Sequence, residues 1–176
     1  MLGPKTKKNL EEAFAGESMA RNKYSYFASA FRKAGYVQIA NIFEETANNE
    51  KEHAKLWAKQ LGLIPAELTE SLKAAIEGER YENEEMYPRM EKEALEEGHP
   101  EIAHLFKEVG EVEEAHEIRY KKLLENIEKG EVFKKVSPRR WKCLNCGYIH
   151  EGEEAPQTCP ACSHPQGYFE IFEETY

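Results

Sequence analysis

Two copies of a Glu-x-x-His motif give this sequence its strongest chemical signal. They are Glu50 with His53 and Glu113 with His116. Residues three apart lie about 60° apart around a helix, so each motif presents a carboxylate and an imidazole side by side. That pair of ligands suits iron, manganese or zinc. Glu17 precedes the first motif by 33 residues and Glu79 precedes the second by 34, which indicates two helix pairs of similar design.

These carboxylates fall on the apolar sides of their helices. At about 100° per residue, Glu113 and His116 share an arc of roughly 120° with nine apolar or aromatic neighbours. The neighbours are Ile102, Leu105, Phe106, Val109, Val112, Tyr120, Leu123, Leu124 and Ile127. The remaining carboxylates lie within apolar stripes of their own helices in the same way. They are Glu17, Glu50, Glu79 and Glu82.

Five carboxylates buried together would cost many kcal/mol unless cations neutralise them. Two ferrous ions bring four positive charges and two ferric ions bring six. The five negative charges of the glutamates lie between these two values. In dinuclear carboxylate bundles, two helices each supply one Glu and two others each supply Glu-x-x-His. The sequence therefore predicts a dinuclear metal site with these ligands: Glu17, Glu50, His53, Glu79, Glu82, Glu113 and His116.

Two further Glu-x-x-His sequences are expected to lie outside this site. A glycine interrupts the one formed by Glu96 and His99. In the one formed by Glu101 and His104, the histidine lies about 180° around the helix from Glu113. We therefore expect His104 to be a solvated surface residue.

The four cysteines form a second candidate metal site. Cys143, Cys146, Cys159 and Cys162 make two Cys-x-x-Cys pairs separated by 12 residues. In a cytoplasmic protein, this pattern is typical of metal binding rather than of disulfides. Tetrahedral sulfur sites hold zinc or iron, so the residues alone leave a structural zinc ribbon and an electron-carrying iron site open.

The composition narrows the class of protein. All 33 acidic residues are Glu, which favours helices more than Asp does. The net charge of −9 argues against nucleic acid or an anionic membrane as a partner. No apolar run approaches the ~18 residues of a membrane span, and the first residues show no apolar signal core. We therefore expect a cytoplasmic location.

Hydrophobic periodicity predicts four long helices, broken by Gly and Pro residues. They should run over about residues 5–33, 36–61, 68–97 and 100–129, with a local kink at Pro88.

The C-terminal part has a different character. Residues 131–140 are expected to be a linker, and short turn-rich segments begin at Trp141. A core that small usually needs a metal or disulfide. The predicted fold is an all-α four-helix bundle over residues 1–137, followed by a small metal-stapled β/loop domain over residues 138–176.

Taken together, the chain resembles rubrerythrin over essentially its whole length. The segments GESMARNKY, ETANNEKEH, EGERYENEEMYP and EVEEAH surround the helical ligands, and CLNCGY with CPAC resembles a rubredoxin. The resemblance implies a ferritin-like four-helix bundle with a rubredoxin-like domain after it. It also implies two iron cofactors, a carboxylate-bridged di-iron site and a mononuclear iron held by Cys143, Cys146, Cys159 and Cys162.

The resemblance further implies a role for each helical ligand. Glu17 would bind one iron, and Glu79 with His116 would bind the other. Glu50 and Glu113 would bridge the two metals.

Two ligands would exchange with the redox state. Glu82 would bind the first iron when the site is oxidised, and His53 would replace it on reduction. Tyr24 and Tyr87 would donate hydrogen bonds that fix carboxylate positions. For Tyr24, plain core packing is an equal alternative.

The implied reaction is the reduction of hydrogen peroxide to water in oxidative-stress defence. Two ferrous ions can deliver two electrons at once to the O–O bond. Single electrons would then return through the four-cysteine iron from a redox donor protein, a rubredoxin or an NAD(P)H-dependent reductase. The nicotinamide would bind elsewhere, because no GxGxxG stretch is present here.

The short connection between the second and third helices bears on assembly. Six residues separate Leu61 from Leu68, and they span at most about 20 Å. The ferritin-like crossover needs about 40 Å. The bundle is therefore either up-down-up-down or exchanged between chains. We expect a homodimer in which helices one and two of one chain pair with helices three and four of the other.

Two other function classes compete with the peroxidase. One is a ferroxidase or iron-handling protein of the ferritin kind, although the fused cysteine domain favours electron import over storage. The other is an interaction module that carries zinc in the cysteine site and has no turnover.

Overall fold

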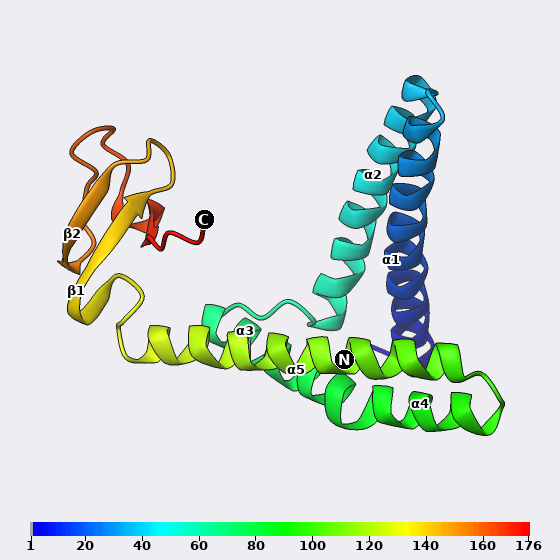
Figure 1. The fold of residues 1–176 in the computed structure, drawn as a ribbon. Coiled ribbons are helices and arrows are strands. Elements are labelled where there is room, and N and C mark those ends of the chain that lie inside the picture. Colours follow the sequence, from blue (N-terminus) through cyan, green and yellow to red (C-terminus); the bar gives the residue numbers. More distant parts are fainter. Residues whose placement is uncertain (1) are drawn as a thin grey trace. The chain divides into compact units, whose positions relative to one another are not determined.

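The structure, a computed structural model, describes residues 2–176. The helices are α1 (Pro4–Lys33), α2 (Val37–Leu61), α3 (Leu68–Tyr81), the π-helix η1 (Glu82–Met86), α4 (Tyr87–Glu96) and α5 (Pro100–Glu128). The strands β1 (Lys134–Cys143), β2 (Ile149–Glu154) and β3 (Phe169–Ile171) follow, with the 3₁₀ turn η2 (Gln166–Tyr168) before β3. Figure 1 shows this order of a helical part and then a small sheet, which confirms the predicted long helices followed by a small β domain.

The chain forms two compact units, Met1–Ala66 and Glu67–Tyr176. In the first, α1 and α2 make an antiparallel hairpin. Ala40, Ala47 and Ala54 recur every seven residues on α2 and are buried, so small side chains let the two helices approach closely. Gly35 makes the turn with a φ of +85°, which a residue without a Cβ adopts readily.

In the second unit, α5 packs along α3, η1 and α4. Ile76, Ala94 and Ala103 are buried at these contacts. Gly110 is also buried, and a Cβ there would lie 3.3 Å from the Cβ of Tyr87. The glycine thus permits a close approach of α5 to the start of α4.

The third predicted helix is interrupted differently from the expectation. We expected a kink at Pro88, and the structure has a π-helix over the five residues before Tyr87. The N–H of Tyr87 bonds to the carbonyl of Glu82, five residues back. Pro88 has no N–H and cannot donate the α-helical hydrogen bond to the carbonyl of Glu84. The α-helix therefore loses one stabilising hydrogen bond at this position.

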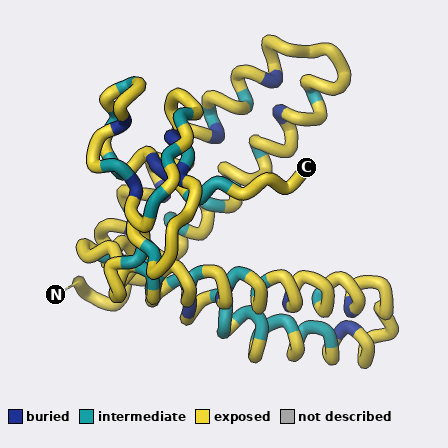
Figure 2. The backbone as a smooth tube through the Cα atoms, turned by 60° about the vertical axis from the view of Figure 1, so that its left-hand side comes forward, coloured by how far each residue is buried: buried dark blue, intermediate teal, exposed yellow. Residues whose placement is uncertain are grey.

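Large apolar side chains remain exposed along the helices. Figure 2 shows buried positions only at intervals along each helix. Six members of the α5 stripe that we expected to be buried are 38–62% exposed. They are Ile102, Leu105, Val109, Val112, Leu123 and Ile127. These six side chains are therefore not covered by the helices that α5 packs along.

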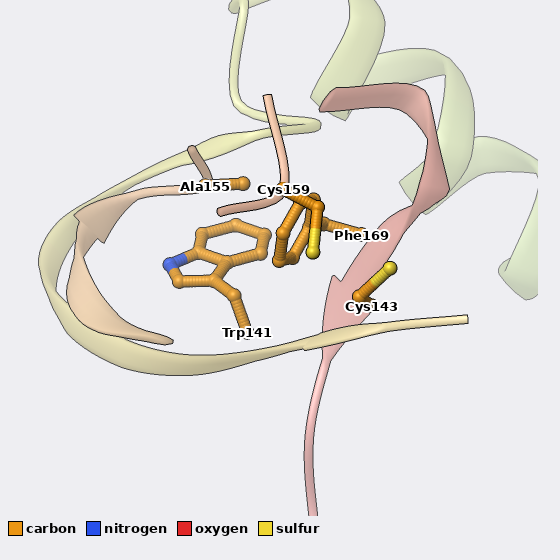
Figure 3. Packing of buried hydrophobic residues seen from close by; sticks show 5 residues of the cluster. All are labelled: Trp141, Cys143, Ala155, Cys159 and Phe169. Atoms are coloured by element: carbon orange, nitrogen blue, oxygen red, sulfur yellow. The ribbon is translucent and has the colours of Figure 1, made fainter. Parts of the chain in front are cut away.

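The C-terminal part is a three-stranded antiparallel sheet in the order β2-β1-β3. Its core consists of Trp141, Cys143, Ala155, Cys159 and Phe169, drawn in Figure 3. The predicted linker was wrong in part, because Lys134–Arg140 belong to β1. Lys134 pairs with Glu154 across the sheet, a non-local contact that the local sequence does not reveal. Within residues 2–176, no helix is long and apolar enough to cross a membrane.

Candidate metal centres

The first unit brings three predicted ligands together. One ligand atom each from Glu17 on α1 and Glu50 and His53 on α2 lies within 4.8 Å of the others. Nδ1 of His53 is 2.8 Å from Oε2 of Glu50 and 3.8 Å from Oε1 of Glu17. The helical spacing of the motif therefore places the imidazole beside its own carboxylate, and the hairpin adds the carboxylate from α1.

The second unit repeats this arrangement. Glu79 on α3 joins Glu113 and His116 on α5, again within 4.8 Å. Nδ1 of His116 lies 2.8 Å from Oε2 of Glu113 and 3.4 Å from Oε2 of Glu79. The internal repeat seen in the sequence thus appears as two three-residue groups of matching chemistry. We call them half-site 1 and half-site 2.

The carboxylates are more buried than the imidazoles. The side chains of Glu50 and Glu113 are 16% and 13% exposed, whereas His53 and His116 are 52% and 36% exposed. Hard carboxylate oxygens with an imidazole nitrogen are a donor set that iron accepts. Each half-site offers two carboxylates and one imidazole.

The metal-free half-sites hold their protons more tightly than isolated carboxyl groups. Burial raises the pKa of Glu17, and a hydrogen bond with Glu50 adds to the effect. Burial likewise raises the pKa of Glu79, with a further contribution from Glu113. Both shifts follow from placing two carboxylates beside each other away from water. A bound cation would remove this penalty.

These shifts predict a pH dependence of the metal-free protein. A raised pKa means that the folded state binds more protons, so its free energy of unfolding rises as the pH falls toward 4.5. We expect E17Q/E79Q, which mimics the protonated form, to be more stable than the wild type at pH 7. The gap should shrink as the pH falls. Urea unfolding of both metal-free proteins between pH 7 and 4.5 measures this, and a constant gap would contradict it.

Glu82 lies at the start of the π-helix and is not part of either three-residue group. Its charge and that of Glu113 raise the pKa of Tyr87, after the larger effect of burial. In α1, Tyr24 follows Glu17 by seven residues, whereas Tyr87 follows Glu79 by eight. The π-helix accommodates that extra residue, and the sequence alone did not show how.

Tyr24 has an aromatic environment. Its ring lies 6.2 Å from that of Phe27 and 5.9 Å from that of Phe43, between ring centres. This contact fits the core-packing role that the sequence left open for Tyr24.

Sequence reasoning missed Glu117. It is a charged residue that is only 5% exposed, and its Oε1 lies 2.7 Å from Nζ of Lys121. The signal was available, because Glu117 stands one turn after Glu113 and one turn before the lysine. By contrast, the expectation for His104 is confirmed, since its side chain is 68% exposed and pairs with Glu108.

The four cysteine sulfurs come together at one side of the sheet domain, with Cys143 and Cys159 buried, Cys162 half-buried and Cys146 exposed. Sγ of Cys143 is 3.7 Å from Sγ of Cys162, and Sγ of Cys146 is 3.6 Å from Sγ of Cys159. A tetrahedral metal with bonds of about 2.3 Å to sulfur has S–S edges of about 3.75 Å. The thiols are free and this spacing is that of metal ligands.

One of these thiols is prepared for ionisation. The backbone N–H of His164 lowers the pKa of Cys162 to about 6, with help from Cys146 and Cys159. Metals bind the thiolate, so this N–H favours the ligating form at neutral pH.

Comparison with known proteins agrees with both centres. The Rubrerythrin family model matches residues 8–124, and the model for the rubrerythrin rubredoxin-like domain matches residues 141–170. A rubrerythrin of Clostridium perfringens is 50% identical over 100% of this chain and 98% of its own length. A rubrerythrin of Nitratidesulfovibrio vulgaris is 45% identical over 97% and 96%.

A solved structure of mixed-valence nigerythrin is 33% identical, covers 98% of this chain and 88% of its own, and superposes with a TM-score of 0.36. The family assignment follows from the sequence matches. The chain belongs to the rubrerythrin family, with a ferritin-like helical part that carries a di-iron site and a rubredoxin-like domain that carries one iron.

Proposed function

We propose that this oxidoreductase is a non-haem di-iron peroxidase that reduces hydrogen peroxide to water. The observation that carries the proposal is the presence, in one chain, of two matched carboxylate–imidazole half-sites and a tetrathiolate centre. When bound, the iron pair supplies two electrons to the O–O bond. The tetrathiolate centre supplies the return route for single electrons, which a ferroxidase or storage protein does not need.

The ligands have distinct parts in this proposal. Glu50 and Glu113, the most buried carboxylates of their half-sites, would be the ligands shared between the two irons. Glu17 would hold one iron, and Glu79 with His116 would hold the other. Each histidine lies against the carboxylate of its own Glu-x-x-His motif, so one imidazole stands beside each proposed shared ligand.

Two ligands, His53 and Glu82, would respond to the redox state. His53 is half exposed, so it has room to move toward or away from a metal. Glu82 would replace it when the site is oxidised. Tyr87 keeps its proton at neutral pH, because burial and the two nearby carboxylates raise its pKa. Its hydroxyl can therefore donate a hydrogen bond that holds Glu82 or Glu113.

We propose further that each complete site forms between two chains. The connection Gly62–Glu67 between α2 and α3 has the six residues expected from the sequence, too few for a ferritin-like crossover of about 40 Å. A second copy's α1 and α2 would supply half-site 1 to the half-site 2 of this chain. The product is a homodimer with exchanged helix pairs.

Mixing two inactive variants tests the exchange. E17A/E50A lacks half-site 1 and E79A/E113A lacks half-site 2. Unfolding and refolding them together should give mixed dimers with one intact site and, after iron loading, about half of the wild-type activity per mixed dimer. Pairing within a chain, or between like units, leaves every site defective. Absence of restored activity in isolated mixed dimers would therefore rule the exchange out.

The reaction itself is tested without oxygen. The iron-loaded protein is fully reduced, one equivalent of hydrogen peroxide per chain is added, and the visible spectrum is followed. We expect rapid oxidation of the di-iron site, then return of the red ferric colour of the cysteine centre. The same trace with O₂ should be far slower. Faster oxidation by O₂ favours the iron-handling function, and absence of the red colour favours zinc.

The electrons are proposed to come from a rubredoxin or an NAD(P)H-dependent reductase in the cytoplasm. The four free thiols are compatible with a reducing compartment.

A further inference from the structure

The two helical units carry opposite net charge. Residues 1–66 contain ten Lys and Arg and seven Glu, a side-chain charge of +3. Residues 67–130, which hold α3, η1, α4 and α5, contain nine Lys and Arg and nineteen Glu, a charge of −10. The overall charge of −9 conceals this division.

The asymmetry does not come from the proposed iron ligands. Without Glu17 and Glu50, residues 1–66 have a charge of +5. Without Glu79, Glu82 and Glu113, residues 67–130 have a charge of −7. The difference therefore lies in the other charged residues of the two units.

The near-identity of the half-sites creates a problem of specificity. Both consist of two carboxylates and one imidazole within 4.8 Å. Two copies of half-site 1, or two copies of half-site 2, would offer the same donor types as one of each. Only a pairing of unlike halves brings Glu82 into every site. Ligand chemistry alone does not impose that choice.

Apolar contact does not impose it either. Both units expose large apolar side chains, among them Phe27 and Ile42 on the first, 44% and 57% exposed, and Leu105 and Val112 on the second, 62% and 49% exposed. Burial of such surface stabilises any pairing of these faces, because the hydrophobic effect is not directional.

We propose that charge selects the partner: the α3–α5 helices of one chain are a docking surface for the basic 1–66 unit of a second copy. Pairing of two −10 units is penalised by repulsion, and pairing of two +3 units lacks attraction. This inference rests on the exchanged assembly of the proposed function. It adds charge as the property that favours pairing of unlike units.

Two double variants separate this complementarity from simple net charge. E12K/E45K takes residues 1–66 from +3 to +7, and E97K/E128K takes residues 67–130 from −10 to −6. Both change the whole chain from −9 to −5. All four glutamates are exposed, and the structure of residues 2–176 gives none of them an ion pair. Lysine at the C-terminal ends of α4 and α5 is compatible with the helix dipole.

The measurement is the dimer dissociation constant of the iron-loaded chain by sedimentation equilibrium, in urea that makes the wild type half dimeric at 0.15 M NaCl. We expect E12K/E45K to bind more tightly and E97K/E128K more weakly, with about a tenfold difference between them. In 1 M NaCl, where the Debye length is about 3 Å, the difference should vanish.

Shifts of both variants in the same direction would show that net charge alone matters, and no shift would also overturn the proposal. Either result leaves peroxide reduction untouched, since the measurement does not use peroxide. A wild type that sediments as a monomer without urea would overturn both this inference and the exchanged assembly.

Discussion

Replacing Glu113 with alanine is expected to remove one bridging ligand and abolish peroxide reduction. Iron should fall from two ions to at most one per site. Loss of supporting residues around a metal already costs 10–100-fold in affinity or activity, so loss of a direct ligand should cost more than about 10²-fold. Iron analysis after gel filtration and the rate of anaerobic oxidation by peroxide measure both effects.

Glu114 supplies the matched control, because it is the next residue on α5 but is exposed. E114A should keep both irons and the wild-type rate. The metal-free form of the Glu113 variant should fold, because Glu113 raises the pKa of Glu79. Without that charge, ionised Glu79 costs less free energy in the folded state. Two irons per site in folded E113A would contradict the proposed ligand set.

Removing the metal from the cysteine centre is expected to unfold the rubredoxin-like domain. Trp141 is completely buried in a core of five residues that includes two of the metal ligands. So small a core contributes little stability, whereas a structural metal contributes about 10–16 kcal/mol in small domains. The chain has two tryptophans, so a W57F variant makes Trp141 the fluorescent reporter.

In W57F, chelation should shift the emission of Trp141 to the wavelength of an exposed indole, while the helical circular dichroism stays nearly constant. Added zinc should restore the buried emission without the red colour, and iron should restore both. Zinc thus separates the folding role of the metal from its redox role. Unchanged emission after complete metal removal would mean that the sheet holds its core without the metal.

The helices and the metal-binding motifs were predictable because their signals are local. Both Glu-x-x-His pairs appear with the side-by-side geometry that helical spacing requires, and the ends of α1, α2 and α5 agree with prediction within a residue or two. The two Cys-x-x-Cys pairs likewise predicted the tetrathiolate centre. Family membership then distinguished iron from zinc, which sulfur ligands and their spacing left open.

Other features depend on contacts between distant parts of the chain. The start of β1 at Lys134 depends on pairing with Glu154, and the burial of Glu117 depends on the elements that pack against α5. The π-helix at Glu82 replaces α-helical hydrogen bonds by others of similar energy, so local propensity does not select it.

The sequence by itself determined which residues could bind metal and on which sides of the helices they lie, because helical periodicity converts spacing directly into direction. Only the tertiary structure decided that the ligands gather in threes, one group in each unit, with the carboxylates more buried than the imidazoles. That outcome depends on which helices pack together. The direction of a side chain depends on the local helix, whereas its burial depends on which other elements pack over it.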